Sequence, residues 1–236
     1  MTAGSGQPAL RLAIVGHGKM GRAIELLAPE RGFTVAAVIG HGTPITRETL
    51  RDADVAVEFT EPAAAPANLR ACLAAGCPVV TGTTGWYDEL PRLTEETWVA
   101  RGALLWAANF SVGVHLFTRM VAEAARLVAG ARGFDAHIVE THHAAKKDAP
   151  SGTAGLVERA ARGALGRPVP ITSVRVGHVP GTHELVLDAA FEQITLAHVA
   201  RDRRVFADGA LVAARWLAGR TGVFTMDDVL GTGGGA

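Results

Sequence analysis

Residues 10–21, LRLAIVGHGKMG, determine how the first half of the chain folds. The run LRLAIV (10–15) is typical of a strand that is buried on both faces, and it leads directly into the glycine-rich GHGKMG. Apolar residues then recur at helical spacing from Met20 to Leu27, and TVAAVI (34–39) follows as a second apolar run. The stretch therefore predicts a strand, a tight turn, a helix and a second strand, which together form a βαβ unit.

The same alternation of apolar strands and helices continues to residue 108. Further strands are predicted at 55–59, 78–82 and 103–108, and helices at 62–76 and 86–100. Between the second and third strands the segment is too short for a full helix. This order predicts the α/β class, with a Rossmann-like doubly wound parallel sheet.

After Asn109 the pattern changes, and a second domain is expected. A helix is predicted at 112–129, a half-exposed strand at 136–141, a helix at about 153–165, and antiparallel strands within 182–200. We expect a dinucleotide-binding domain at 1–109 and 209–236, to which the C-terminal helix returns. A smaller α+β domain for substrate binding and oligomerisation is expected at 110–208.

Composition excludes several classes of function. The 236 residues carry a formal net charge of zero and are 48% hydrophobic, so no global field favours nucleic acid or an anionic membrane. No apolar run approaches the ~20 residues that span a bilayer, and the first residues lack the pattern of a signal peptide. Cys72 and Cys77 have no metal-ligand spacing and are expected to be small apolar residues. We predict a cytoplasmic protein without nucleic-acid or membrane partners.

The glycine loop, residues 16–21, has the G-x-G-x-x-G pattern of a dinucleotide site. Gly16 allows the tight turn, Gly18 lets the backbone approach a pyrophosphate, and Gly21 lets helix and strand pack closely. The helix N-terminus offers N–H groups and a positive dipole end to the phosphates. A plain βα turn without a ligand is the alternative that the pattern leaves open.

The end of the second strand lacks a feature that NAD sites commonly have. An acidic residue there bonds the ribose hydroxyls of NAD, whereas this chain has Gly40 and His41. The absence of an acid removes the repulsion of a 2′-phosphate, and Lys19 and His41 are able to reach such a group. We therefore expect NADPH and/or NADH as cofactor, with NADPH accepted at least as well as NADH.

The histidine–lysine segment, residues 140–153, has the sequence ETHHAAKKDAPSGT and holds two of the three lysines in the chain. Lysine has a pKa that moves with its environment, and histidine titrates near neutrality. The Ser151 and Thr153 hydroxyls and the N–H groups of the following helix form a site for a carboxylate. These residue types predict a site for an anionic substrate that must be protonated.

Residues 140–154 closely resemble the motif E-x-H-H-x-x-K-x-D-A-P-S-G-T-A of the 4-hydroxy-tetrahydrodipicolinate reductase (dihydrodipicolinate reductase) family. The resemblance covers most of the chain. GHGKMG, VEFTEP, TGTTGW, AANFSVGV and RRVFADGA match further family segments in the family's order. RVGHVPGTHEL (175–185) resembles its R-x-G-x-x-x-G-x-H segment, although the connection from 167 to 181 is shortened here.

The resemblance implies a role for each matching residue. His142 is implied as the general acid, and Lys146 as its partner that binds a substrate carboxylate or assists proton donation. The implied and expected binding residues are, for substrate, His143, Lys146, Ser151, Gly152 and Thr153, and, for cofactor, Gly16, His17, Gly18, Lys19, Met20, Gly21, Gly40, His41, Gly82, Thr83, Thr84, Ala107, Ala108, Asn109 and Phe110.

The resemblance also implies the reaction and the assembly. The expected reaction is NAD(P)H-dependent reduction of 4-hydroxy-tetrahydrodipicolinate, or its dehydrated form, to tetrahydrodipicolinate in diaminopimelate and L-lysine biosynthesis. The substrate is then a small dicarboxylate, and the family is typically a homotetramer. Because a nicotinamide must lie against the substrate, closure of the two domains, with hinges near Asn109 and Asp208, is a further hypothesis.

Three other interpretations remain at this stage. His142, His143 and His137 are possible metal ligands, but no cysteine lies near and adjacent strand positions point opposite ways, so no metal is expected. A different dehydrogenase of this architecture, for amino acids or semialdehydes, would differ in the substrate it turns over. A non-catalytic nucleotide sensor would not need His142 and Lys146.

Overall fold

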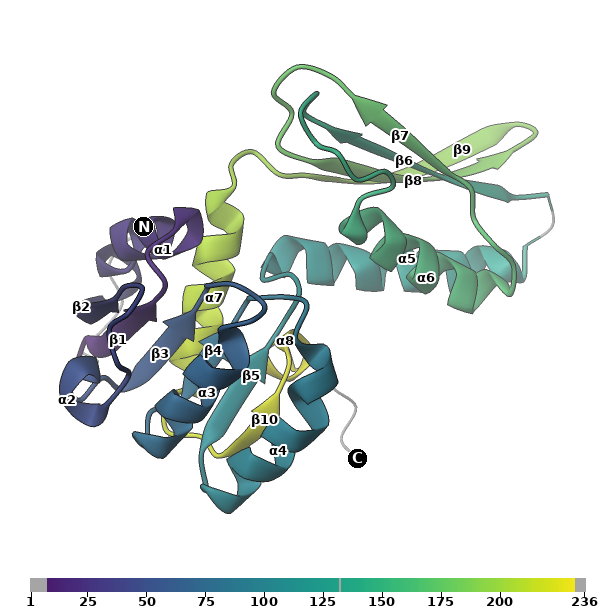
Figure 1. Cartoon of the computed structure of the whole chain (residues 1–236). Helices are drawn as coiled ribbons and strands as arrows, with labels where there is room; N and C mark the ends of the chain where they lie inside the picture. Colours follow the sequence, from purple (N-terminus) through teal and green to yellow (C-terminus); the bar gives the residue numbers. More distant parts are fainter. Residues whose placement is uncertain (1–7, 132, 232–236) are drawn as a thin grey trace. The chain divides into compact units, whose positions relative to one another are not determined.

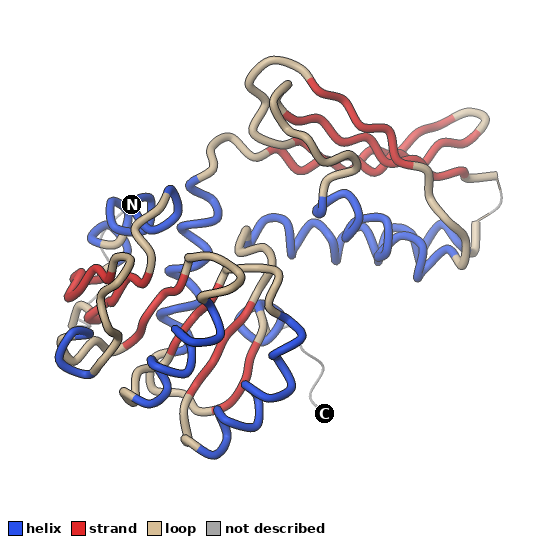
Figure 2. Tube along the Cα trace, in the orientation of Figure 1, coloured by secondary structure: helices blue, strands red, loops and turns tan. Residues whose placement is uncertain are grey.

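A computed structural model of the chain describes residues 8–131 and 133–231. The chain divides into two compact units, of which the first ends at Phe110 and resumes at Phe206, and the second is Ser111–Val205. Figure 1 labels the elements of both units, and Figure 2 separates their helices, strands and loops by colour. The assignment of cofactor binding to the first unit, and of substrate binding and oligomerisation to the second, stays a prediction.

The first unit is built on a six-stranded sheet. In spatial order its strands are β10 (Gly222–Phe224), β5 (Ala103–Trp106), β4 (Val79–Thr81), β3 (Val55–Glu58), β1 (Leu10–Val15) and β2 (Phe33–Ile39). All five pairings are parallel. β1 pairs with β2 on one side and with β3 on the other, so the strand order reverses at β1. This confirms the Rossmann-like doubly wound sheet, whose ligand site is expected at the strand ends where the order reverses.

Helices cover both faces of this sheet. They are α1 (Lys19–Leu27), α2 (Arg47–Leu50), α3 (Ala65–Ala74), α4 (Leu90–Val99), α7 (Arg204–Leu217) and α8 (Met226–Val229), with the 3₁₀ turns η1 (Pro29–Arg31) and η2 (Tyr87–Glu89). Figure 1 shows α3 and α4 on one face and α1 and α7 on the other. The ion pair between Arg31 and Asp208, 2.5 Å long, holds α7 beside η1. The C-terminal helix therefore does return to the first unit.

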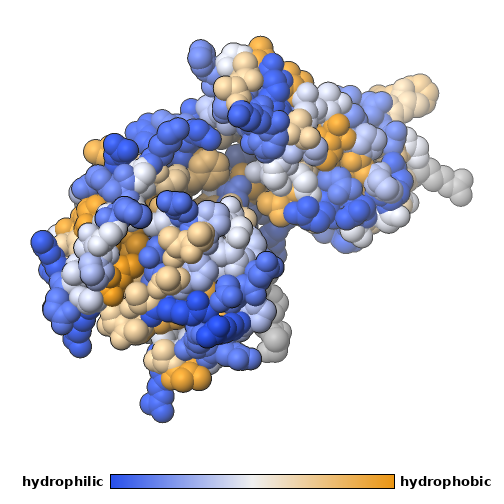
Figure 3. Space-filling view, viewed as in Figure 1, coloured by the Kyte–Doolittle hydropathy of each residue, from blue (hydrophilic) through white to orange (hydrophobic). Residues whose placement is uncertain are grey.

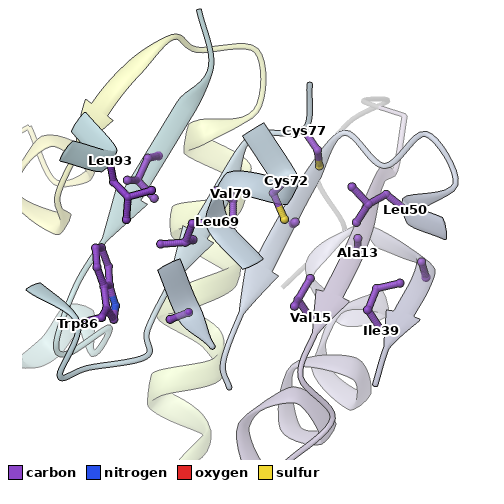
Figure 4. Packing of buried hydrophobic residues seen from close by; sticks show 14 residues of the cluster. Ala13, Val15, Ile39, Leu50, Leu69, Cys72, Cys77, Val79, Trp86 and Leu93 are labelled. Atoms are coloured by element: carbon purple, nitrogen blue, oxygen red, sulfur yellow. The ribbon is translucent and has the colours of Figure 1, made fainter. Parts of the chain in front are cut away.

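The core beneath α3 and α4 is apolar, as Figure 4 shows. Leu69 and Leu93 from the helices pack with Val79 and Trp86 against the sheet. Cys72 and Cys77 are buried in this cluster as free thiols, and burial raises the pKa of both, that of Cys77 to about 12. Because a protonated buried thiol is a poor nucleophile, both cysteines are the packing residues that their spacing predicted.

The second unit has a four-stranded sheet covered on one face by two helices. Its strands, in spatial order, are β7 (Ile171–Arg175), β6 (Asp135–His142), β8 (Thr182–Ala189) and β9 (Glu192–Val199), and its helices are α5 (Val112–Ala129) and α6 (Gly152–Leu165). β6 pairs parallel with β7 and antiparallel with β8, which pairs antiparallel with β9. Ser111 and Ser151 cap the two helices, and Gly166 ends α6 at φ +69°.

Two strands were not expected from the sequence. β7 lies in the 167–181 connection, where its residues are only partly buried and alternate weakly. β10 has three residues, and it extends the first sheet after α7 has returned. Both are short strands at the edge of their sheets, where no long apolar run marks them. The predicted helix at 62–76 is also shorter, since Glu61–Ala64 form a turn before α3 begins.

The face seen in Figure 3 is largely hydrophilic, with scattered apolar side chains. No helix within the described ranges combines the length and the apolar character that crossing a membrane requires.

Candidate active site

The glycine loop has the geometry that its three glycines predicted. Gly16 has φ +96°, and a Cβ there would lie 2.2 Å from the Phe59 carbonyl oxygen. A Cβ on Gly21 would lie 2.0 Å from the Gly16 oxygen, so helix α1 and strand β1 meet without room for a side chain. Nothing lies within 4 Å of a Cβ on Gly18, so the backbone faces open space there. Two of the glycines shape the loop, and the third leaves it accessible.

The first turn of α1 presents backbone groups and one exposed cation. Gly18 is the N-cap, and among the described residues no side chain caps this end of the helix. Lys19 is exposed at the first helical position. His17 is also exposed, but its Nε2 lies 2.6 Å from Glu25 Oε2 on α1, which directs the imidazole toward the helix. The loop therefore offers N–H groups and Lys19 to an anion.

Two cavities adjoin the glycine loop. The first, of about 490 Å³, is lined by Gly16, His17, Gly18, Gly40, His41 and the following Gly42 and Thr43, as well as by residues 59–61. The second, of about 420 Å³, is lined by Gly18, Lys19, Met20, Gly82, Thr83 and Thr84. Together the two cavities are lined by ten of the residues predicted to bind cofactor, whereas Gly21 is buried beneath the loop. Open space above a glycine cradle at the switch point fits a dinucleotide.

The acidic residue of this region lies after β3 rather than after β2. Glu61 lines the first cavity, whereas the segment after β2 reads Gly40, His41, Gly42, Thr43. Thr43 and Gly42 were not predicted, and the signal that could have found them is the turn that immediately follows His41. The residues after β2 thus carry no negative charge toward a ribose or its phosphate.

The 82–84 turn is held by its own polar groups. The Thr83 hydroxyl accepts a hydrogen bond from Thr60 N at 2.8 Å, and the Thr83 carbonyl accepts one from Trp86 Nε1 at 2.7 Å. Gly82 lies against the Phe59 ring, which a Cβ would overlap. Thr83 is therefore buried and stabilises the turn, whereas the neighbouring Thr84 is exposed.

The structure does not place the predicted 107–110 residues around either cavity. Ala107 and Phe110 are buried, and the Phe110 ring packs against Phe59 with centroids 5.7 Å apart. Ala108 is exposed and Asn109 is half-buried. Their contact with a cofactor stays a prediction.

Sequence reasoning missed Glu58, a fully buried carboxylate at the end of β3. It accepts hydrogen bonds from the Thr60 hydroxyl and, at 2.6 Å, from the Thr81 hydroxyl. Asn68 donates to both Glu58 and Thr60, at 3.4 and 3.1 Å. The sequence signal that could have identified Glu58 is its position directly after the apolar residues VAV (55–57) of a buried strand. Its hydrogen bonds fix the turn that lies beneath the first cavity.

In the second unit, His142 lies at the buried end of β6 in contact with a carboxylate. Its Nδ1 is hydrogen-bonded to Glu140 Oε2, and Glu140 is wholly buried. Arg175, opposite His142 on β7, donates from its Nη2 to Glu140 Oε1 at 2.7 Å. Because β strands alternate, residues 140 and 142 share one face of the sheet, and the register of β7 adds the guanidinium.

These contacts determine the charge state of the cluster. Burial opposes ionisation of Glu140, but hydrogen bonds from Arg175 and Ser173 and the charge of His142 outweigh it and lower its pKa to about 2. Burial lowers the pKa of His142, although Glu140 acts in the opposite direction. Glu140 is therefore an anion at neutral pH, and His142 is neutral with a proton on Nδ1.

Lys146 and the N-terminus of α6 lie on the same segment as His142. Lys146 Nζ donates to the Asp148 carboxylate at 2.9 Å, and this contact lowers the pKa of Asp148. The buried Ser151 Oγ accepts from Ala154 N at 3.1 Å as the N-cap, while Gly152 is exposed and Thr153 half-buried in the first turn. His143 is half-buried beyond the end of the strand. The predicted substrate residues thus lie on one continuous segment.

His183 joins this cluster from β8. It lies opposite Glu140 in the β6–β8 register, its ring centroid is 5.2 Å from that of His142, and its Nε2 is 3.1 Å from Ser151 Oγ. Burial, followed by the charge of His142, lowers the pKa of His183 to about 4, so the imidazole is neutral. The signal for it in the sequence was only the H of the R-x-G-x-x-x-G-x-H match.

The metal interpretation involves a different set from the one weighed in the sequence. His137 is half-buried and is hydrogen-bonded to Thr172, whereas Glu140, His142 and His183 have potential ligand atoms within 4.8 Å of one another. The Arg175 guanidinium is already bonded to Glu140, and its charge opposes a cation at that carboxylate. The donor set serves a proton-transfer site better than a metal site.

A glycine-loop cavity at the switch point of a doubly wound sheet, and a histidine–carboxylate–lysine cluster on a separate mixed sheet, define a nicotinamide-dependent oxidoreductase. Comparison with known proteins specifies the family. Residues 10–110 match the family model described as "Dihydrodipicolinate reductase, N-terminus", and residues 113–230 match the one described as "Dihydrodipicolinate reductase, C-terminus". The chain therefore belongs to the dihydrodipicolinate reductase family.

Curated relatives carry the name 4-hydroxy-tetrahydrodipicolinate reductase. The protein from Christiangramia forsetii is 35% identical over 94% of this chain and 98% of its own length. The protein from Gluconobacter oxydans is 42% identical over 76% of this chain and 78% of its own length. Family membership makes this chain an NAD(P)H-dependent oxidoreductase.

A solved structure has the same fold. Dipicolinate-bound dihydrodipicolinate reductase from Paenisporosarcina sp. TG-14 superposes with a TM-score of 0.77 and 22% identity, covering 93% of this chain and 98% of that one. The similarity extends over both units.

Proposed function

We propose that the chain reduces 4-hydroxy-tetrahydrodipicolinate, or its dehydrated form, to tetrahydrodipicolinate in diaminopimelate and L-lysine biosynthesis, with His142 as the general acid. The observation that carries the proposal is the buried Glu140–His142 pair on the same segment as Lys146 and the α6 N-terminus. The names of the relatives and the family match support the reaction.

The first unit supplies the site for the dinucleotide. When bound, the nicotinamide cofactor supplies the hydride. The first turn of α1 would hold its pyrophosphate, and the 40–43 turn, which has no acid, would accept a ribose with or without a 2′-phosphate, which Lys19 would reach. We propose that NADPH is accepted at least as well as NADH.

The second unit supplies a cationic site for a dicarboxylate. Lys146 is part-buried, and its partner Asp148 is exposed, so a substrate carboxylate is able to compete for the ammonium. The first turn of α6, with Ser151, Gly152 and Thr153, would bind a carboxylate through backbone N–H and hydroxyl groups. The dipicolinate named in the structural neighbour is a planar diacid, which supports this substrate class.

His142 is suited to deliver the proton. Its Nδ1 is committed to Glu140, so Nε2 is the atom that gains and gives the exchangeable proton. The burial that lowers its pKa makes the imidazolium a stronger acid than an exposed one. Lys146 adds positive charge nearby, which acts in the same direction.

Other features stay proposals of the same kind. They are a homotetramer assembled through the second unit, a cytoplasmic location, and closure of the units during turnover. The size of the particle in solution, measured by sedimentation, tests the first of these directly.

The test of the function is to follow NADPH and NADH consumption with the freshly made product of the preceding pathway enzyme. Turnover is expected with both cofactors, and a preference for NADH above tenfold would contradict the cofactor proposal. Lys146→Ala is expected to lower kcat and raise the substrate KM, each by about tenfold, because a charged hydrogen bond is lost. The neighbouring exposed Lys147→Ala is the matched control.

The alternatives give different results. An amino-acid or semialdehyde dehydrogenase of this architecture would turn over those compounds and not the dipicolinate precursor. A nucleotide sensor would not consume NADPH or NADH even as the wild-type protein. Its affinity for the cofactor would also be the same after His142 and Lys146 are both replaced.

A further inference from the structure

Arg175 connects the two parts of the histidine–lysine segment. Its Nη2 donates to Glu140 Oε1 at 2.7 Å and to the Asp148 carbonyl oxygen at 2.6 Å, while Nη1 donates to the Val174 carbonyl at 2.8 Å. Glu140 is bonded to the proton donor His142, and the Asp148 side chain is bonded to Lys146. One guanidinium therefore contacts the partner of each functional side chain.

The Glu140 carboxylate is fully engaged in these contacts. Oε1 accepts from Arg175 and, at 3.3 Å, from Ser151 N, and Oε2 accepts from His142 Nδ1. Glu140 is completely buried, and the Arg175 side chain is only 18% exposed. A buried carboxylate with this set of donors has one stable orientation, because each oxygen has its own partner.

We propose that Arg175 is a positioning residue, which orients and partly neutralises the Glu140 carboxylate that faces His142 and, through the Asp148 carbonyl, fixes the loop that carries Lys146. This inference rests on the proposed function only where it concerns turnover; the tautomer and the loop are properties of the protein without substrate.

The tautomer of neutral His142 follows from the hydrogen-bonding capacity of Glu140. An ionised Glu140 accepts hydrogen bonds only, so neutral His142 must carry its proton on Nδ1 and leave Nε2 bare. Protonation then adds a proton at Nε2 alone, which is the proton that the acid can give. Without Arg175, no guanidinium would offset the negative charge of Glu140. Glu140 would then stabilise the imidazolium form of His142 more strongly and make it a weaker acid.

The fork of the guanidinium is what the site requires. Glu140 lies on β6, Val174 on β7 and Asp148 in the loop, so three acceptors from three places converge on one planar group. A lysine at this position would carry the charge, but its ammonium cannot reach the same three acceptors in a plane. Arg175→Lys should therefore retain part of the effect of Arg175 on the pKa of His142, but it should lose the hydrogen bond that fixes the loop at the Asp148 carbonyl.

The charged and titratable groups around His142 are Glu140 on its own strand, Arg175 on β7, Lys146 in the loop and His183 on β8. His183 is neutral at neutral pH, so Glu140, Arg175 and Lys146 govern the titration. Removal of Arg175 leaves Glu140 dominant. The pKa of His142 should rise by about one unit, and the limb of kcat that requires the protonated acid should move to higher pH by the same amount.

The experiment is ¹⁵N NMR of histidine-labelled protein without substrate, recorded against pH for the wild type and four variants. The wild type should show Nδ1 protonated and Nε2 bare in neutral His142. Glu140→Gln should reverse this, because Arg175 takes the amide oxygen and the amide NH₂ faces Nδ1. Arg175→Met should keep the tautomer and raise the pKa, with Arg175→Lys intermediate.

The matched control is Arg167→Met. Arg167 also bridges to a carboxylate of β6, donating to Asp135 at 2.8 Å, but at the far end of the strand and on the surface. Its loss should leave the His142 tautomer, pKa and kcat unchanged. If Arg175→Met fails to fold, Arg175→Lys and the double variant Glu140→Gln/Arg175→Met, which removes both charges, serve in its place.

Kinetics separate positioning from a structural role. Arg175→Met should lower kcat about ten- to a hundredfold, by analogy with the loss of outer hydrogen-bond partners of metal-bound histidines, and raise the substrate KM through Lys146. A wild-type His142 with its neutral proton on Nε2, or an unchanged His142 pKa in folded Arg175→Met, would overturn the proposal. If the wild type turns over no dipicolinate precursor, the proposed function fails while the NMR result stands by itself.

Discussion

The glycine loop and the histidine–lysine segment prepare for their ligands in opposite ways. The glycine loop presents backbone: Gly16 and Gly21 fit only because they lack a Cβ, and Gly18 faces open space. The histidine–lysine segment presents side chains, and its Glu140 and Ser151 side chains are buried and hydrogen-bonded. The first site is thus defined by shape, and the second by charge and proton position.

This difference predicts how each region fails. Changes in the glycine loop should act through space and backbone strain, and should affect stability and cofactor affinity together. Changes in the histidine–lysine segment should act through protonation and charge, and should affect kcat and its pH dependence. The following four predictions test that contrast, from the largest effect to the smallest.

His142→Gln should lower kcat by ~10²–10⁴, the contribution of a positioned general acid, with little change in cofactor affinity. Steady-state kinetics and a cofactor titration measure the two quantities. His137→Gln is the matched control, because His137 lies on the same strand but is only half-buried and is hydrogen-bonded to Thr172. A variant that retained a tenth or more of wild-type kcat would remove His142 from the role of acid.

Gly16→Ala should lower the free energy of unfolding by about 1–3 kcal/mol, since the new Cβ meets the Phe59 carbonyl and φ is +96°. NADPH affinity should fall as well. Gly18→Ala is the comparison, because a Cβ there meets nothing; its stability should change by less than about 1 kcal/mol while the cofactor is still bound more weakly. Chemical denaturation and cofactor titration measure both. Equal stability losses in the two variants would contradict the shape argument.

His183 should make the protein less stable in acid. Its pKa is depressed to about 4 in the folded state, so the unfolded chain binds the extra proton as pH falls below about 6.5. The free energy of unfolding should fall by on the order of 2–3 kcal/mol between pH 6.5 and 4 from this group. His183→Gln should reduce that slope, and His178→Gln, at an exposed position, should retain it. The same slope in both variants would show that His183 titrates normally.

Lys19→Gln should raise the KM for NADPH about fivefold and leave that for NADH nearly unchanged, since one exposed charge contact is worth about 1 kcal/mol. Arg47→Gln, which removes an exposed cation on α2, is the control. An equal change for both cofactors would mean that Lys19 contacts the pyrophosphate rather than a 2′-phosphate.

The two regions also differ in how far the sequence predicted them. The strand, turn and helix of the glycine loop follow from local patterns, because φ, close packing and apolar periodicity depend on neighbours along the chain. The same holds for α5 and for the stop of α6 at Gly166. Local chemistry and local structure agree there, so the sequence was sufficient.

The partners of the histidine–lysine segment depend on strand register, which no local pattern carries. Arg175 meets Glu140 because β7 pairs with β6, and β7 was not predicted. His183 meets Ser151 because β8 places it opposite Glu140. The sequence could name Glu140, His142 and Lys146 through the family motif, but it could not show that Arg175 is bonded to Glu140 or that His183 lies beside His142.

The most direct measurement is a crystal structure of the enzyme with a nicotinamide cofactor and dipicolinate. We predict that His142 Nε2 and Lys146 Nζ lie within about 3.5 Å of the diacid, the reach of a hydrogen bond. A diacid bound with both groups turned outward, more than about 10 Å away, far beyond that reach, would contradict it.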